Sequence, residues 1–140
     1  MSASEGRLRI HPAERFAGAE RALDLPAALR ALRAEPHPGA QGHRQIALLH
    51  HGPVRLVLYA FEPGGRIPEH QAPGWVTLHV LRGKLRVRTP EARHELAEGQ
   101  VLALVPDVPH DIEASVEADM LLGVYPAGPL GERRDNAVII

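Results

Sequence analysis

The 140-residue chain contains no cysteine and few aromatic residues, and Trp75 is its only tryptophan. The absence of cysteine excludes both a disulfide framework and thiolate ligands for a metal. No apolar run is long enough to span a bilayer, and the first residues do not resemble a signal peptide. We therefore expect a soluble, cytoplasmic protein that does not act on membranes.

The chain also has no excess of charge of one sign, because 16 Lys and Arg residues are balanced by 17 Asp and Glu residues. The arginines are scattered rather than clustered, which argues against a nucleic-acid partner. No Ser-His-Asp signature or phosphate loop is present, so acyl transfer and nucleotide hydrolysis are not expected. Glycine and proline are abundant, with 13 residues of each, which is typical of a β-rich domain with many turns.

One helix is predicted, over about residues 26–34. Asp24 can cap its N-terminus, Pro26 suits the first turn, and Pro36 ends a run of leucines at helical spacing. The first 20 residues are polar and rich in alanine, with a strand expected near residues 8–10.

Two aliphatic stretches, residues 43–51 and 54–62, are predicted to form a hairpin about a Gly-Pro turn. His43, His50 and His51 lie at the strand ends beside turns. We expect these three histidines to be solvated rather than to act as ligands.

A second hairpin is predicted between residues 75–81 and 84–89, with Gly83 supplying the positive φ of a two-residue turn. Because side chains alternate across a strand, one face is apolar and is expected to point inward. That face carries Val76, Leu78, Val80, Leu85 and Val87. The opposite face is polar and carries Thr77, His79, Arg86 and Arg88.

The last strands follow from similar patterns. Residues 101–105 are continuously apolar, which predicts a strand buried on both faces. In the next strand His110 shares a face with Ile112 and Ala114, and this face is expected to point inward. Residues 120–125 are predicted to pair back onto that strand.

We expect a lead-in with the helix over residues 1–42, a barrel over 43–125 and a tail over 126–140. About eight short strands with one leading helix favour an all-β jelly roll. The apolar residues 138–140 suit packing on a neighbouring subunit, and we expect a homodimer.

Two stretches that each contain a histidine, GGRIPEHQAPGWVTLHVLRG (64–83) and GQVLALVPDVPH (99–110), resemble the two signature motifs of the cupin superfamily. In the first, His70 follows Gly64 after the five residues that the motif requires, and Gly83 matches the closing glycine. The resemblance covers about half of the chain. It implies a double-stranded β-helix, or jelly-roll barrel, with an interior pocket.

The resemblance also implies a site for a divalent metal, Fe, Mn, Ni or Zn, in which His70 and His110 match ligand positions. Two other ligand positions depart from the motif: Ala72 replaces a histidine and Val76 replaces a glutamate. Pro106 also departs from the usual spacing of the second motif. A third ligand is needed to complete such a site.

We rank the candidates for the third ligand as His79, then His94, then Glu69. His79 lies on the predicted polar face and would need a β-bulge near Trp75 to turn inward. His94 shares its alternation with Leu96 and can face the interior.

Trp75, Gln71 and Val76 are expected to border the pocket. Gln71 neighbours His70, although alternation points it away, and Trp75 is either a lid over the pocket mouth or an interface residue. If the polar face of the predicted hairpin lined the pocket instead, Arg86 and Arg88 would suit a carboxylate or phosphate.

Three functions remain open. The first is a metal-dependent pocket for a small polar organic ligand, with catalysis by oxygenation, isomerisation or hydrolysis left undecided. The second is a metal-free cupin that binds or senses a ligand. The third is a structural domain that dimerises through its outward sheet and tail. Fold alone does not choose between them, because function depends on the site.

Overall fold

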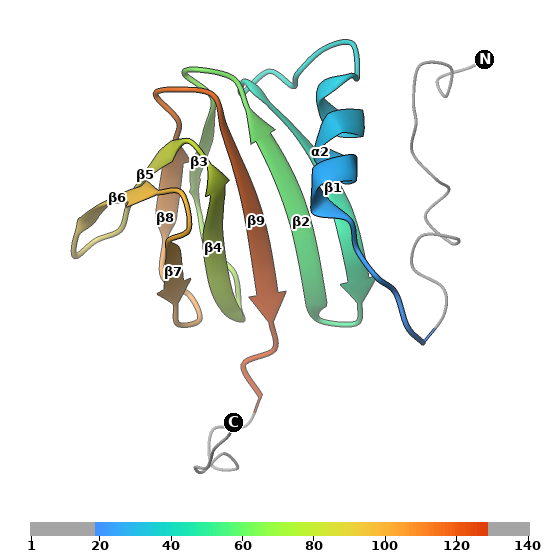
Figure 1. The fold of residues 1–140 in the computed structure, drawn as a ribbon. Helices are drawn as coiled ribbons and strands as arrows, with labels where there is room; N and C mark the ends of the chain where they lie inside the picture. The colour runs from blue at the N-terminus through green and yellow to red at the C-terminus, as the bar shows by residue number, and fades with distance from the viewer. Residues whose placement is uncertain (1–18, 129–140) are drawn as a thin grey trace.

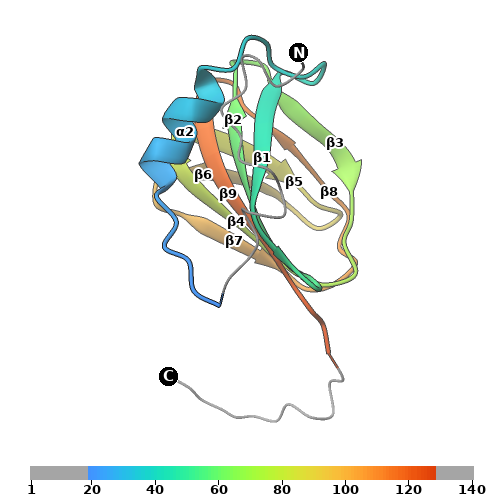
Figure 2. The same ribbon diagram turned by 90° about the vertical axis from the view of Figure 1, so that its right-hand side faces the viewer.

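Two antiparallel β-sheets pack face to face, and one helix covers part of the outer face of the larger sheet (Figures 1 and 2). This computed structural model describes residues 19–128. The strand expected near residues 8–10 and the apolar end at 138–140 lie outside the described residues. Within residues 19–128, no helix combines the length and the apolar character needed to cross a membrane.

The elements follow one another as α2 (Leu25–Arg33), β1 (His43–His51), β2 (Val54–Phe61), β3 (Arg66–His70), β4 (Trp75–Arg82), β5 (Lys84–Arg88), β6 (Arg93–Ala97), β7 (Val101–Leu104), β8 (His110–Glu113) and β9 (Ala118–Tyr125). The larger sheet has the strand order β1-β2-β9-β4-β7, and the smaller has the order β3-β8-β5-β6. This arrangement confirms the all-β jelly roll with one short helix.

Helix α2 begins and ends within one residue of its predicted bounds. The Asp24 side chain accepts a hydrogen bond from the backbone N–H of Ala27 at 3.0 Å, as expected of an N-cap. Leu32 is buried where the helix packs against β1 and β2. The helix therefore covers the outer face of these two strands.

The β1–β2 hairpin is confirmed, with His51 opposite Val54 next to the turn. His43 differs from the prediction of a solvated histidine. Its ring lies 5.3 Å from that of Tyr59 and 5.5 Å from that of Phe61, between ring centroids, and its Nδ1 atom is buried. His43 faces the interior because it shares its alternation with the core residues of β2 across the pair.

The second predicted hairpin is wrong. Strand β4 lies between β9 and β7 in the larger sheet, whereas β5 lies between β8 and β6 in the smaller one. The chain therefore crosses from one sheet to the other at Gly83, which has a φ of +83°. The predicted pairing of residues 120–125 with the strand at His110 is wrong for the same reason, because β8 and β9 belong to different sheets.

The predicted apolar face is nevertheless correct, since both sheets turn such faces inward. Its five residues are all buried: Val76, Leu78, Val80, Leu85 and Val87. Strand β7 is not buried on both faces, however. It is the edge strand of its sheet, and Val101 and Val105 remain 53% and 51% exposed while Leu104 is buried.

Arg86 and Arg88 point outward from the smaller sheet. Arg86 pairs with Glu95 at 2.8 Å, and Arg88 pairs with Asp111 at 2.9 Å. The alternative in which these two arginines line the pocket is therefore wrong, because their faces are opposite to the buried Leu85 and Val87.

Candidate functional site

His70 and His110 are direct partners in the smaller sheet, at the end of β3 and the start of β8. Their ring centroids lie 4.3 Å apart, with the ring planes tilted by 58°. The register of β3 against β8 shifts between Ile67 and His70, so an irregularity precedes the pair. The fold thus brings together two histidines from the two separate motifs.

Backbone carbonyls orient both rings in the same way. His70 Nδ1 lies 2.9 Å from the carbonyl oxygen of Pro68, and His110 Nδ1 lies 2.9 Å from that of Val108. A carbonyl oxygen only accepts, so each Nδ1 carries a proton, and a ring with no second proton keeps the lone pair of its Nε2. Two acceptor nitrogens are therefore available side by side.

His110 is 1% exposed, and its Nε2 is buried without a hydrogen-bond partner in the described part of the chain. Burial lowers the pKa of His110, and the hydrogen bond to the Val108 carbonyl only partly opposes this effect. The ring is therefore neutral near pH 7. An unpartnered buried acceptor costs free energy, which a ligand that donates a hydrogen bond would recover.

The two positions where the metal-binding motif has further ligands are apolar here and belong to the core or pack against it. Val76 is 3% exposed within the core, and Ala72 packs against that core. The Ala72 carbonyl accepts a hydrogen bond from the backbone N–H of Asp107 at 2.8 Å, which ties the segment after β3 to the loop before β8. The two positions at which the motif departs from the metal-binding pattern are thus filled by hydrocarbon.

The structure does not bring the candidate third ligands to the histidine pair. His79 lies on the outer face of the larger sheet, on the side opposite to Leu78 and Val80. Glu69 is exposed. Among residues 19–128, no three His, Asp or Glu side chains gather closely enough to hold a metal ion.

His94 does face inward, opposite Val87 across the β5–β6 pair. It borders a cavity of about 450 Å³ between β6 and β7, together with Glu91 and Asp107. This cavity lies on the β6–β7 side of the barrel and does not include either residue of the histidine pair.

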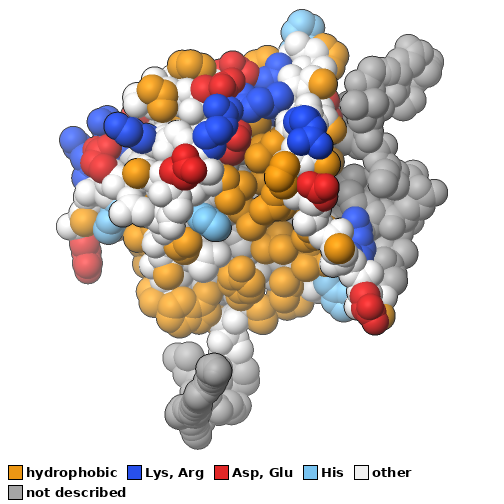
Figure 3. Space-filling model, viewed as in Figure 1, with side chains coloured by type: hydrophobic (Ala, Val, Ile, Leu, Met, Phe, Trp, Pro, Cys, Tyr) orange, Lys and Arg blue, Asp and Glu red, His pale blue; other side chains and the backbone are white. Residues whose placement is uncertain are grey.

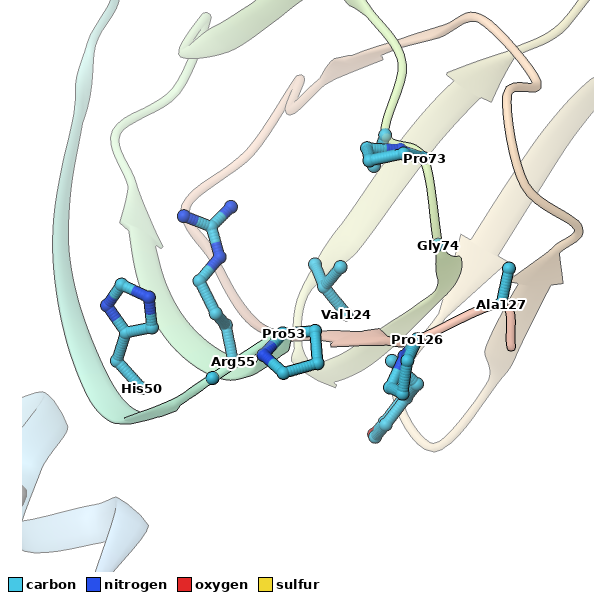
Figure 4. Close-up of a pocket in the computed structure, with 11 residues that line it drawn as sticks. His50, Pro53, Arg55, Pro73, Gly74, Val124, Pro126 and Ala127 are labelled. Atoms are coloured by element: carbon cyan, nitrogen blue, oxygen red, sulfur yellow. The ribbon is translucent and has the colours of Figure 1, made fainter. Parts of the chain in front are cut away.

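A second cavity, of about 440 Å³, opens at the end of the barrel where the β1–β2 hairpin meets the segments around Pro73 and Pro126 (Figure 4). It is lined by His50, Gly52, Pro53, Arg55, Ala72, Pro73, Gly74, Val124, Tyr125, Pro126 and Ala127. We call it the mouth cavity. Ala72, the position that the motif reserves for a second histidine, is part of its wall.

Of the predicted pocket residues, none lines the mouth cavity. Trp75 follows Gly74 but is 41% exposed and shares the outward alternation of His79. Gln71 is exposed, and Val76 is a core residue. Arg55 and His50 were missed, although alternation with Val57 along β2 would have placed Arg55 on the inner face.

The matching motifs, the two-sheet barrel and the paired histidines can be compared with known proteins. The family model described as "Cupin domain" matches residues 57–124, about half of the chain. The chain is a small cupin-domain protein. No curated protein sequence matches it.

Solved structures share this fold at low sequence identity. A cupin superfamily protein from Desulfitobacterium hafniense has a TM-score of 0.64 and 20% identity, over 78% of this chain and 94% of that one. A conserved protein of unknown function from Streptococcus pyogenes has a TM-score of 0.62 and 20% identity, over 81% and 93%. KdgF from Halomonas sp. has a TM-score of 0.56 and 17% identity, over 71% and 86%.

Cupin domains often bind divalent metals, and the histidine pair fits such an ion only in part. The two imidazoles suit it, because each Nδ1–H is fixed by a carbonyl and each Nε2 is free to bind, as in metal-bound histidines. The donor set is incomplete, however, since Ala72 and Val76 supply no ligand and no third side chain joins the pair within residues 19–128. The described residues do not fit a metal held by three or more protein ligands.

Proposed function

We propose that this cupin domain binds a small polar organic molecule in its barrel, with Nε2 of His70 and of His110 as the hydrogen-bond acceptors. The observation that carries this proposal is the buried, unpartnered Nε2 of His110. Most buried polar groups in folded proteins are hydrogen-bonded, so an orphaned one calls for an explanation. A ligand O–H or N–H group would satisfy it.

The neighbourhood of the pair supports a ligand rather than an internal partner. Val76 and Ala72, at the two other ligand positions of the motif, carry no polar group that could partner the two nitrogens. Pockets for small molecules typically combine mostly apolar walls with a few placed polar groups. The mouth cavity, which Ala72 borders, has a volume within the usual range for such sites.

A metal-binding function is the second candidate, and the orientation of both rings by the carbonyls of Pro68 and Val108 favours it. In that case the two Nε2 atoms would hold the ion, and water or the ligand would complete its coordination. Two protein ligands predict weak binding that a chelator removes easily.

The experiment is a thermal-shift screen of small hydroxylated acids, alcohols and amines on protein stripped with chelator, alone and with added Zn²⁺. It compares wild type with His110→Gln, His70→Gln and the control His79→Gln, which changes a histidine on the outer face. We expect compounds that stabilise wild type and His79→Gln but neither site variant. Direct isothermal titration then gives the affinity.

The two candidates give different results. Stabilisation that needs Zn²⁺, together with near-stoichiometric metal by elemental analysis, supports the metal-binding function. Stabilisation without metal supports the first proposal. If no compound stabilises the wild type under either condition, or if the site variants respond as wild type does, the pocket is not a binding site of this kind.

We also infer a homodimer formed through the outer face of the larger sheet. Two rows of side chains cross β7, β4 and β9 there, and a third crosses β4 and β9, without a single Lys, Arg, Asp or Glu. They are Val101, His79 and Leu121, then Ala103, Thr77 and Gly123, and finally Trp75 and Tyr125. Figure 3 shows hydrophobic side chains gathered over this part of the molecule, with charged groups above it. Such uncharged exposed patches commonly mark interfaces.

A further inference from the structure

The β1–β2 hairpin contributes two polar residues, His50 and Arg55, to the inner face of the larger sheet. The proposed function does not use either of them. Arg55 lies opposite His50 on β1 and opposite Val124 on β9. Val124 in turn lies opposite Val76 on β4. The four residues form one row across the inner face of the larger sheet.

This row relates Arg55 to Val76, one of the two positions where a ligand of the cupin motif is replaced. Two steps between strands separate Arg55 from Val76, so their Cα atoms lie roughly 10 Å apart. The long side chain of an arginine can span much of such a distance. Arg55 also shares its alternation along β2 with Val57 and Phe61, which belong to the core. It therefore extends the inner face toward the mouth of the barrel.

Figure 4 shows Arg55 and His50 extending from neighbouring strands into the mouth cavity, with Pro73 and Gly74 across from them. The residues that line this cavity include no Asp or Glu. Arg55 forms no ion pair within residues 19–128, in contrast to Arg86 and Arg88. The guanidinium thus faces a small cavity without a protein carboxylate.

The charge of Arg55 also acts on the barrel interior. The buried hydroxyl of Tyr59, on the same strand and face, has a pKa raised by burial, and the positive charge of Arg55 opposes this rise. Arg55 itself lines the mouth cavity, so its charge would act directly on an anion bound there. The walls formed by Val124 and Pro73 carry no charge that would oppose such an interaction.

We propose that Arg55 is the anion-binding residue of this pocket and that the ligand is a small organic acid. Its carboxylate would lie against the guanidinium at the mouth, with His50 beside it. Its hydroxyl groups would donate to Nε2 of His70 and His110 deeper in the barrel. This inference rests on the proposed ligand-binding function and adds the chemical class of the ligand.

The geometry of the Arg55 guanidinium favours a carboxylate as the ligand group. The planar guanidinium offers two parallel N–H donors that match the two oxygens of a carboxylate. A cavity of about 440 Å³ holds a small molecule and not a polymer. No Asp or Glu lines the cavity, so no carboxylate of its wall competes with a negatively charged ligand for Arg55.

The experiment uses acids and neutral compounds of the same shape. Gluconate is compared with sorbitol, and lactate with 1,2-propanediol, by isothermal titration at low ionic strength, with inorganic phosphate as a separate probe. The proteins are wild type, Arg55→Gln, Arg55→Lys, His110→Gln and the control Arg93→Gln. Arg93→Gln removes the same charge from an exposed position on β6.

We expect wild type and Arg93→Gln to prefer each acid over its neutral counterpart. Loss of one charged hydrogen-bonded contact predicts acid binding about 10- to 100-fold weaker in Arg55→Gln, with the neutral compounds unaffected. Arg55→Lys should restore binding only in part, because an ammonium group does not form the paired contact.

Several results would overturn the inference, and they separate it from the proposed function. If acids and neutral compounds bind wild type equally and His110→Gln abolishes both, the pocket binds ligands but Arg55 does not select them. If Arg55→Gln binds acids as wild type does, the same conclusion holds. If phosphate alone binds, the site takes an anion but not an organic acid. If nothing binds, both proposals fail.

Discussion

Asp119 at the start of β9 accepts a hydrogen bond from Nε of Arg82 at the end of β4, at 3.0 Å, although the carboxylate is almost completely buried. Its other oxygen pairs with Arg33 of helix α2. Arg33 also donates to the carbonyl of Ala118 at 3.1 Å. One buried carboxylate therefore joins the helix to the centre of the larger sheet.

Asp119→Ala should destabilise the protein by about 2–3 kcal/mol, because it leaves Arg33 without its buried partner. The loss is smaller than for a fully buried pair, since Arg82 is half exposed. Urea unfolding monitored by circular dichroism gives the free energy. The control is Glu117→Gln, which removes a half-exposed carboxylate bound to the same two arginines. It should cost less than about 1 kcal/mol, and equal losses in the two variants would contradict this interpretation.

Gly83→Ala should lower the stability of the protein more than Gly64→Ala does. Both glycines have a φ near +83°, where an alanine costs about 1–2 kcal/mol. A Cβ on Gly83 would also meet the backbone of Glu117 and Ala118, whereas a Cβ on Gly64 would meet nothing within 4 Å. The difference between the two melting temperatures thus reports the close approach at the crossover between the sheets. Equal melting temperatures would show that the backbone there relaxes freely.

Stability should fall as pH falls from 7 to 5, and His110 should be one cause. Burial lowers the pKa of His110 in the folded state, so above the ordinary value of about 6.5 the ring is neutral in both states and its contribution is complete. Below that value the unfolded chain takes up a proton that the folded protein resists, at up to about 1.4 kcal/mol per pH unit. Unfolding free energies for His110→Gln should therefore depend less on pH than those of wild type. His79→Gln is the control, and matching curves for wild type and His110→Gln would refute the assignment.

Val101→Glu should convert the proposed dimer to a monomer while the fold is retained. Val101 is 53% exposed on the uncharged outer face, so a carboxylate there is tolerated in the monomer but is repelled by its copy across an interface. Light scattering coupled to gel filtration measures the mass. Val116→Glu changes a valine that is 46% exposed outside these rows and should leave the mass unchanged. A wild-type protein that is monomeric at high concentration would rule out this interface.

Local sequence patterns were sufficient to predict part of the structure. The bounds of α2 followed from its cap and its prolines, and the inward face of Val76, Leu78 and Val80 followed from alternation. The jelly roll and the inward position of His110 could also be predicted, because the motif resemblance and the alternation of its strand agree.

Strand partners could not be predicted in the same way. A glycine with positive φ suits a tight hairpin turn and also a crossing between sheets, so Gly83 did not distinguish them. Strand β4 pairs with β9, which lies some 40 residues further along the chain, and nothing in a local pattern encodes that register. Alternation along β2 places Arg55 on the inner face, but it was missed as a pocket residue because the opposite walls of the cavity come from distant segments around Pro73 and Pro126.

The position of β9 has a consequence for how the protein is made. Within residues 19–128 this strand is the last along the chain, yet it lies at the centre of the larger sheet, between β2 and β4. Until residues 118–125 have left the ribosome, the β1–β2 hairpin and the β4–β7 pair have no strand to join them. The barrel therefore closes only after this strand has been made, and its many contacts between distant residues make folding slow. Until then the apolar inner faces of the earlier strands stay uncovered, as surfaces of the kind that chaperones bind.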